Sequence, residues 1–230
     1  MEEIRIIEVK QSILADNDQD AAALRSELGR QKTFLLNLMS SPGAGKTTTL
    51  LKTFEKIRDE MKIGVMEADI DSDVDTRKIL GAGVESIQIH TGGMCHLDAE
   101  MTRQGLREIG SEKYDLVILE NIGNLVCPAE FDTGAVKNAM ILSVPEGDDK
   151  PLKYPLMFEI SDCVLINKCD VLPVFPDFDT EKVVERIKMR NPDAAIFFIS
   201  ARTGEGIDAW CDWLRARVAE WKQNNCILII

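Results

Sequence analysis

The fold of this chain is indicated first by nine consecutive residues, Ser40-Ser41-Pro42-Gly43-Ala44-Gly45-Lys46-Thr47-Thr48. They stand between an apolar run and an amphipathic one, which predicts a loop that joins a strand to a helix. In such a loop, backbone N–H groups turn onto phosphate oxygens, and the helix N-terminus adds partial positive charge. Lys46 then reaches the β- and γ-phosphates, and the Thr47 hydroxyl is a ligand for Mg²⁺. We therefore predict that residues 43–48 bind a nucleotide, although Ser40 replaces the glycine that usually opens this pattern.

Short apolar runs alternate with helical patterns from residue 33 onward. This alternation is typical of a mainly parallel sheet covered by helices on both faces. We therefore predict a three-layer α/β fold of the P-loop nucleotide-triphosphatase kind, in which ligands gather at the carboxyl ends of the strands. Residues 21–28 form a separate helical pattern, and Gly29 is its expected stop. The predicted units are an N-terminal helical appendage (1–32), a nucleotide-binding domain with a metal site (33–223) and an apolar C-terminal tail (224–230).

The composition limits the classes of function. The 230 residues carry a formal net charge of −12, and such a surface repels phosphate backbones, which argues against nucleic-acid binding. No apolar run approaches the roughly 20 residues that a helix needs to cross a bilayer, so no membrane role is expected. The first residues lack a secretory signal pattern, which predicts a cytoplasmic protein. Its six cysteines are then reduced and serve as metal ligands or core residues.

A second motif, Asn167-Lys168-Cys169-Asp170, follows an apolar run at the point where a nucleotide base should lie. Guanine presents two adjacent donors, N1–H and N2–H₂, and one carboxylate accepts both, whereas adenine does not offer that pair. Asp170 therefore predicts guanine selectivity, because a site built around such contacts rejects the analogue that lacks them. Asn167 is expected at the ring edge, and the Lys168 stem over the base. Ser200, Ala201 and Arg202 complete the predicted pocket, with the Ala201 N–H donating to guanine O6.

Two acidic segments compete for Mg²⁺, which prefers oxygen ligands and usually takes one or two carboxylates. One segment spans 67–75, and the other begins at Glu120; each follows a predicted strand. Asp71 and Glu120 lie nearest their strand ends, and we expect them to hold Mg²⁺ together with Thr47. Asp75 is expected to act from a mobile loop, whereas the remaining aspartates of its segment are interpreted as solvated surface.

Hydrolysis of the nucleotide requires an in-line attack by water, assisted by positioning and by neutralisation of charge. Gly123 suits a segment whose backbone N–H senses the γ-phosphate and is released after hydrolysis. No residue identifies itself in the sequence as a water-positioning group or an arginine finger, so we expect slow turnover. The predicted catalytic set is Lys46, Asp71, Asp75, Glu120 and Gly123.

Cys95 and His96 follow one predicted strand, and Cys127 follows another, so all three are expected at the carboxyl edge of the sheet. Two thiolates and an imidazole suit Zn²⁺, and Ni²⁺ in a planar arrangement is a second option. Residues 95 and 96 either serve one metal with a main-chain nitrogen or are shared across a dimer. The alternative is that the cysteines are small core residues and the histidine only hydrogen-bonds. The other four cysteines are interpreted as structural.

These motifs occur together with Asp149-Lys150-Pro151-Leu152-Lys153-Tyr154-Pro155. As a set, from about residue 33 to 221, they resemble the hydrogenase nickel-incorporation GTPases, the HypB family of P-loop GTPases. The resemblance implies GTP hydrolysis, a homodimer promoted by GTP, and Ni²⁺ or Zn²⁺ at Cys95, His96 and Cys127 near the dimer interface. It also implies nickel delivery to the [NiFe]-hydrogenase large subunit with a small zinc-containing nickel chaperone. Lys153 is a candidate for contact with a nucleotide across the dimer.

Some family members carry an N-terminal cysteine motif or a histidine-rich stretch that stores nickel, and this sequence has neither pattern. Transfer of nickel is therefore expected, and high-capacity storage is not. Three other functions remain open: a urease-type nickel-insertion GTPase, a metal-sequestering protein in which the nucleotide is only structural, and a regulatory GTPase with inert cysteines.

Overall fold

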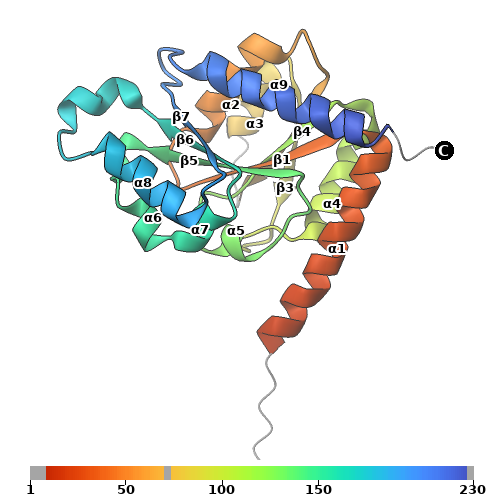
Figure 1. The fold of residues 1–230 in the computed structure, drawn as a ribbon. Coiled ribbons are helices and arrows are strands. Elements are labelled where there is room, and N and C mark those ends of the chain that lie inside the picture. Colours follow the sequence, from red (N-terminus) through yellow and green to blue (C-terminus); the bar gives the residue numbers. More distant parts are fainter. Residues whose placement is uncertain (1–8, 70–73, 227–230) are drawn as a thin grey trace, which may run out of the picture.

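A computed structural model describes residues 9–69 and 74–226, and its seven strands form one parallel sheet (Figure 1). The order of the strands is β3-β2-β4-β1-β5-β6-β7. Because every strand runs in the same direction, all of their carboxyl ends meet at one edge. The strands are β1 (Phe34–Ser40), β2 (Ile63–Asp69), β3 (Glu85–His90), β4 (Leu116–Glu120), β5 (Lys137–Ser143), β6 (Cys163–Asn167) and β7 (Ala195–Phe198).

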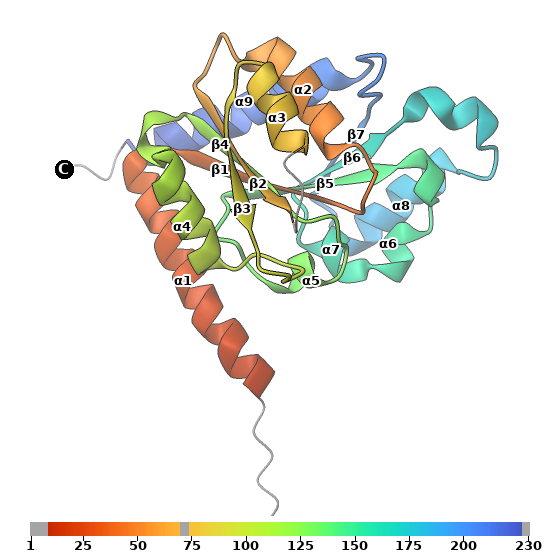
Figure 2. The same ribbon diagram turned by 180° about the vertical axis from the view of Figure 1, so that it is seen from behind.

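Helices cover both faces of the sheet, which confirms the predicted three-layer α/β fold (Figures 1 and 2). On one face, α2, α3 and α9 enclose a core that includes Phe54 and Trp210. On the other face, α1 and α4 pack at one end of the sheet, and α7 and α8 at the other. The helices are α1 (Val9–Gln31), α2 (Lys46–Ile57), α3 (Val74–Gly81), α4 (Ala99–Ile109), α5 (Cys127–Glu130), α6 (Lys150–Lys153), α7 (Pro155–Glu159), α8 (Thr180–Arg190) and α9 (Ile207–Asn224).

The central strands explain why continuous apolar runs predicted a parallel sheet. Strands β1, β4 and β6 are buried along their whole length, because helices cover both of their faces. Their register places functional segments side by side. Leu38 of β1 pairs with Glu120 of β4, and Ser143 of β5 pairs with Asn167 of β6. The phosphate loop, the acidic segment after β4 and the base motif therefore leave the sheet at the same edge.

Helix α1 differs from the expectation in its length. It continues through Gly29 to Gln31, so Gly29 does not stop it. A Cβ atom at Gly29 would lie 2.5 Å from Asn225 Oδ1, so the glycine permits a close approach rather than a helix end. In its described part this helix packs on the domain: Ala21, Leu24 and Leu28 are buried, and the two leucines join the core between α1 and α4.

Helix α9 ends one residue beyond the predicted domain boundary at 223. Asn224 belongs to α9 rather than to a tail, and residues 227–230 lie outside the described residues. Trp210 of α9 donates from Nε1 to Thr53 Oγ1 at 3.0 Å, which satisfies the indole inside the core. Among the described residues, no helix is both long and apolar enough to span a bilayer.

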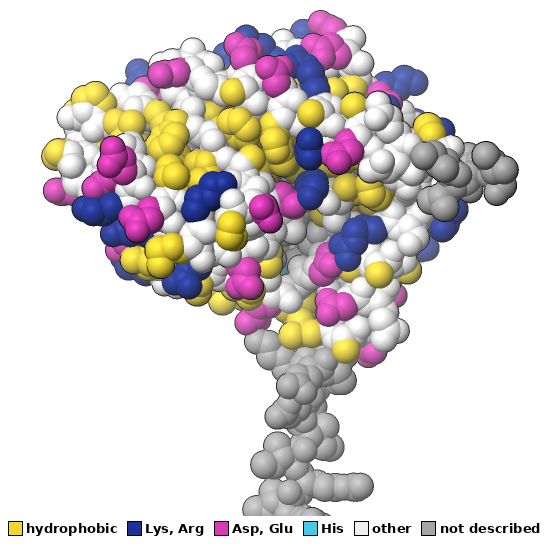
Figure 3. All heavy atoms as spheres, viewed as in Figure 1, with side chains coloured by type: hydrophobic (Ala, Val, Ile, Leu, Met, Phe, Trp, Pro, Cys, Tyr) yellow, Lys and Arg dark blue, Asp and Glu magenta, His cyan; other side chains and the backbone are white. Residues whose placement is uncertain are grey.

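The surface seen in Figure 3 carries basic and acidic side chains that are interspersed. Hydrophobic side chains show between α8 and α9, over the edge strand β7, whose four residues are half-buried. No large single-sign patch appears on this face, although the whole chain has a net charge of −12.

We predict that Leu24→Ala destabilises the fold by about 2–5 kcal/mol, the usual cost of truncating a buried leucine. The side chain of Leu24 is 1% exposed. Leu80→Ala is the matched control, because Leu80 lies on helix α3 and is 49% exposed. Urea denaturation of both variants measures the two changes. Equal, small changes would show that α1 is a loose appendage after all.

Candidate nucleotide and metal site

The phosphate loop depends on its glycines and on Ser40. Gly43 and Gly45 have φ angles of 74° and 102°, in the left-handed region that favours glycine. Lys46 Nζ donates to Ser40 Oγ at 3.0 Å. The serine that departs from the usual pattern therefore contacts the lysine predicted to bind phosphate. Thr47 and Thr48 follow in the first turn of α2, with the helix N-terminus behind the loop.

A cavity of about 280 Å³ lies beside the phosphate loop, at the carboxyl end of β6. Its lining combines predicted residues from three separate segments of the sequence. The space that they enclose is large enough for part of a nucleotide. Its lining is Gly45, Thr48, Asn167, Lys168, Asp170, Val171, Ala201 and Arg202.

Asn167 holds this pocket together through its side-chain amide. Its Nδ2 donates to the Ala44 carbonyl at 2.9 Å, and its Oδ1 accepts from the N–H groups of Lys168 and Ala201. The Ala201 N–H, which we expected to meet guanine O6, is thus bonded to Asn167 at 3.0 Å in this structure. Lys168 Nζ donates to the Gly43 carbonyl at 2.7 Å, so its stem lies along the edge of the loop.

The carboxylate of Asp170 is oriented by a neighbour from the segment that follows β7. Ser200 Oγ donates to Asp170 Oδ1 at 2.7 Å. Arg202 Nη1 lies 4.0 Å from Asp170 Oδ2, and its side chain is 85% exposed, so it adds little restraint. Asp170 is therefore held with one oxygen anchored to Ser200, in a pocket that also contains Asn167 and Lys168.

Two of the predicted Mg²⁺ ligands contact each other. Thr47 Oγ1 donates to Glu120 Oε1 at 2.9 Å, and both residues are buried. Two oxygen groups at the mouth of the phosphate loop fit the ligand preference of Mg²⁺. Asp71 lies outside the described residues. The backbone of Asp75 lies in helix α3 rather than in a loop, contrary to our expectation.

Gly123 packs against the phosphate loop, as its predicted role requires. A Cβ atom at this position would lie 3.1 Å from Pro42, which leaves no room for a larger residue without a shift. The sequence patterns did not indicate this contact between Gly123 and Pro42.

Glu146 is a further residue that the sequence analysis missed. Its carboxylate accepts from the Ser41 hydroxyl of the phosphate loop. The same side chain accepts from Ser143 N and Oγ, each at 2.8 Å, in a capping box. The pattern Ser-x-x-Glu at 143–146 was the available signal, because it predicts a capped turn directly after a strand.

The structure brings two of the three predicted nickel or zinc ligands together. Cys95 Sγ and Cys127 Sγ are 2.8 Å apart, although Cys95 lies in the loop after β3 and Cys127 is the first residue of α5, after β4. The hydrogen bond with the Cys127 thiol raises the pKa of Cys95.

His96 does not join the pair. Its ring stacks on Phe131 with centroids 3.8 Å apart, and its buried Nδ1 has no hydrogen-bond partner. Within the described ranges, no group of three His, Cys, Asp or Glu side chains is close enough to hold a metal. The predicted triad is therefore a thiol pair with a neighbouring imidazole.

The remaining predicted residues take positions away from this pair. Lys153, on the short helix α6, forms an ion pair with Asp149 at 2.5 Å and is 60% exposed. Cys163 and Cys211 are buried in the core, and burial raises the pKa of Cys163 well above its ordinary value and that of Cys211 to about 11. Such thiols are poor metal ligands at neutral pH, in keeping with a structural role.

Comparison with known proteins supplies the family. Residues 34–198 match the model described as "CobW/HypB/UreG, nucleotide-binding domain". A hydrogenase maturation factor HypB from Azotobacter chroococcum is 44% identical over 210 residues, which cover 91% of this chain and 68% of the relative. A hydrogenase/urease maturation factor HypB from Helicobacter pylori is 39% identical over 223 residues, 95% of this chain and 91% of the relative.

The fold agrees with that assignment. A crystal structure of HypB from Helicobacter pylori in complex with nickel superposes with a TM-score of 0.83 at 39% identity, covering 89% of this chain and 96% of the other. The phosphate loop, the base motif at 167–170 and the two thiols all lie at the edge of the sheet where ligands gather in such folds. The chain belongs to the CobW/HypB/UreG family of P-loop nucleotide-binding proteins and, within it, to the HypB hydrogenase maturation factors.

Proposed function

We propose that this chain is a GTP-hydrolysing nickel metallochaperone, which couples GTP binding and hydrolysis to nickel delivery into the [NiFe]-hydrogenase large subunit. One observation carries the proposal: Gly123, which packs on the phosphate loop, and Cys127 belong to one short segment. The thiol of Cys127 lies 2.8 Å from that of Cys95. A shift of this segment with the state of the nucleotide changes the spacing of the thiols. Nucleotide states that space the thiols differently bind nickel differently, and the coupling is reciprocal.

The hydrolytic step uses charge and positioning. Lys46 neutralises the developing negative charge on the phosphates, and Gly123 places a backbone N–H near the γ-phosphate. Mg²⁺, when bound by Thr47 and Glu120 with Asp71 or Asp75 in support, supplies further charge neutralisation at the phosphates. We expect slow turnover, because the sequence motifs provide no evident water-positioning group or arginine finger.

Nickel is the proposed cargo, with Zn²⁺ as its competitor. Two thiolates are half of a four-coordinate site, and His96 adds an imidazole only if its ring leaves the stack with Phe131. A homodimer that apposes two such pairs supplies the missing ligands. The Helicobacter pylori relative crystallised with nickel supports nickel as the cargo. The expected partners are a small zinc-containing nickel chaperone and the hydrogenase large subunit.

Urease maturation is the second candidate function. It is favoured by one observation: the name of the Helicobacter pylori relative includes both hydrogenase and urease. A pull-down from the source cell that recovers urease maturation proteins rather than hydrogenase ones would replace the first proposal with this one.

We predict that nickel binding depends on the nucleotide. Protein loaded with a non-hydrolysable GTP analogue should be more dimeric than GDP-loaded protein by light scattering, and its nickel affinity or coordination geometry should differ. The thiolate-to-nickel absorption band reports the binding. Equal nickel affinity in both states would instead favour a sequestering protein.

Cys127→Ser tests the thiol pair in the same titration. Loss of a direct ligand should weaken nickel binding by at least about 10-fold, since even outer-shell changes cost that much. Cys226→Ser is the matched control, because Cys226 is an exposed cysteine near the end of the described chain. Unchanged nickel binding in both variants would favour a regulatory GTPase with inert cysteines.

We predict that Asp170→Asn weakens GTP binding by about 100-fold or more, because an amide presents a donor to a guanine donor. Affinity for xanthosine triphosphate should rise, since xanthine offers an acceptor at position 2. Fluorescent-nucleotide titration measures both. Asp177→Asn is the control with the same charge change at an exposed residue. Equal GTP affinity in the two variants would exclude Asp170 from base recognition.

A further inference from the structure

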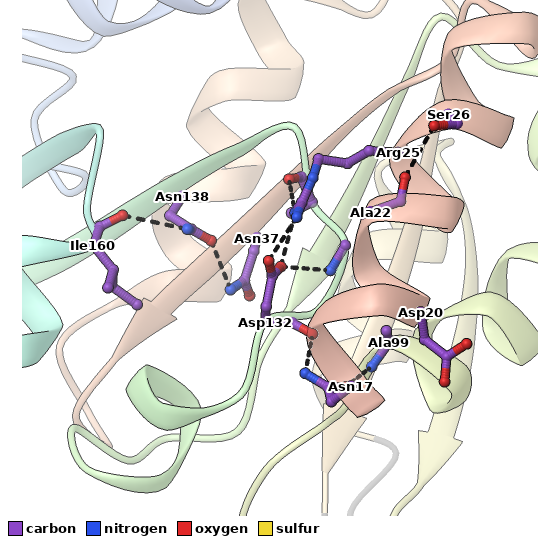
Figure 4. Close-up of polar contacts among 12 residues, drawn as sticks. Asn17, Asp20, Ala22, Arg25, Ser26, Asn37, Ala99, Asp132, Asn138 and Ile160 are labelled. Atoms are coloured by element: carbon purple, nitrogen blue, oxygen red, sulfur yellow. Dashed lines mark hydrogen bonds and ion pairs between the residues drawn. The ribbon is translucent and has the colours of Figure 1, made fainter. Parts of the chain in front are cut away.

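Helix α1 contacts the chain shortly after each of the paired thiols, at Ala99 and at Asp132 (Figure 4). Ala99 comes three residues after His96, and Asp132 comes five residues after Cys127. The side chain of Asn17 lies between them. Its Oδ1 accepts from the Ala99 N–H at 2.9 Å, and its Nδ2 donates to the Asp132 carbonyl at 2.9 Å. One amide on α1 therefore bonds to the backbone of two segments: the first residue of α4, which follows the Cys95 loop, and Asp132, which follows α5.

Asn17 occupies an unusual place on the helix. It lies at helical spacing before Ala21, Leu24 and Leu28, the residues that bury α1 against the core. It is itself only 8% exposed. A buried amide at a core-facing position is costly unless its donor and acceptor are satisfied. Here its two bonds go to the start of α4 and to the segment after α5, so the amide is satisfied only while α1 and these two segments keep their present spacing.

A second set of contacts fixes α1 to the loop after Cys127. Arg25 donates from Nη1 and Nη2 to the two carboxylate oxygens of Asp132, at 2.8 and 2.7 Å (Figure 4). Burial opposes ionisation of Asp132, but the bonds from Arg25 and from the Gly134 N–H lower its pKa overall. A Cβ atom at Gly134 would lie 2.7 Å from Leu24, so the helix and this turn are in close contact. The segment after α5 is therefore held by α1 at two residues, Asp132 and Gly134.

We propose that Asn17 is a positioning residue for the thiol pair: its amide bridges the start of α4, four residues after Cys95, and Asp132, five residues after Cys127, so that α1 sets the spacing of the two thiols. Within this proposal, only the expected effect on nickel affinity rests on the proposed function. Helix α1 thereby takes part in the site, because its displacement changes the positions of both bonded segments at once. It also predicts that Asn17 acts without touching the metal.

The test compares Asn17→Ala with Gln31→Ala in the full chain. Gln31 is the matched control, since its Oε1 accepts from Ser111 Oγ at 3.0 Å near the other end of α1. The first measurement needs no metal. Diamide takes two electrons and two protons from Cys95 and Cys127 as their disulfide forms, and peptide mapping by mass spectrometry gives the rate. The second measurement is nickel titration, and the third is GDP affinity.

Asn17→Ala should slow closure of the Cys95–Cys127 disulfide several-fold and weaken nickel binding by about 10-fold, the usual effect of losing an outer-shell partner. Gln31→Ala should leave both within twofold of the parent protein. GDP affinity should be unchanged in both variants, because neither residue lines the base pocket. Closure at the parent rate in Asn17→Ala would overturn the inference.

Asn17→Asp keeps the test decisive if the alanine variant fails to fold. The aspartate still accepts from the Ala99 N–H but faces the Asp132 carbonyl with an acceptor, so disulfide closure should again be slowed. A parent-like rate in this variant would also overturn the inference. If the parent protein shows no thiolate–nickel absorption while Asn17→Ala still slows closure, the proposed metal function fails and the positioning role stands.

Discussion

The parallel direction of the seven strands is the constraint on which the site depends. Strands β1, β4 and β6 end at one edge, so the phosphate loop, Glu120 and Asn167 meet although they are far apart in the sequence. Asn167 then joins the base pocket to the phosphate loop through the Ala44 carbonyl. The parallel strands bring these three segments together, and a small number of side-chain hydrogen bonds set the distances between them.

The same edge links nucleotide chemistry to the thiols. Glu120, the last residue of β4, contacts Thr47, and the segment that follows continues through Gly123, which packs on Pro42, to Cys127. A single stretch of backbone thus contacts the phosphate loop and carries a thiol. Such an arrangement allows reciprocal coupling, because a ligand that prefers one position of the segment changes affinity at both ends.

Much of the fold follows from local patterns, because strands buried on both faces are read as continuous apolar runs. The base motif could be recognised for a similar reason, because Asn167 and Asp170 lie within four consecutive residues. What local patterns missed depends on distant partners. Gly29 has the signature of a helix stop, but it permits contact with Asn225. His96 adjoins Cys95 in the sequence, yet stacking on Phe131 takes its ring away from the thiols.

Strand β3 lies at one end of the sheet, and β4 lies inside it. The Cys95 loop therefore leaves an edge strand with a single neighbour, whereas the Cys127 loop leaves a strand with neighbours on both sides. Sequence changes after β3 disturb fewer core contacts than changes after β4. The Cys127 half of the thiol pair is therefore anchored to a strand that is fixed from both sides, whereas the Cys95 half is anchored from one side alone.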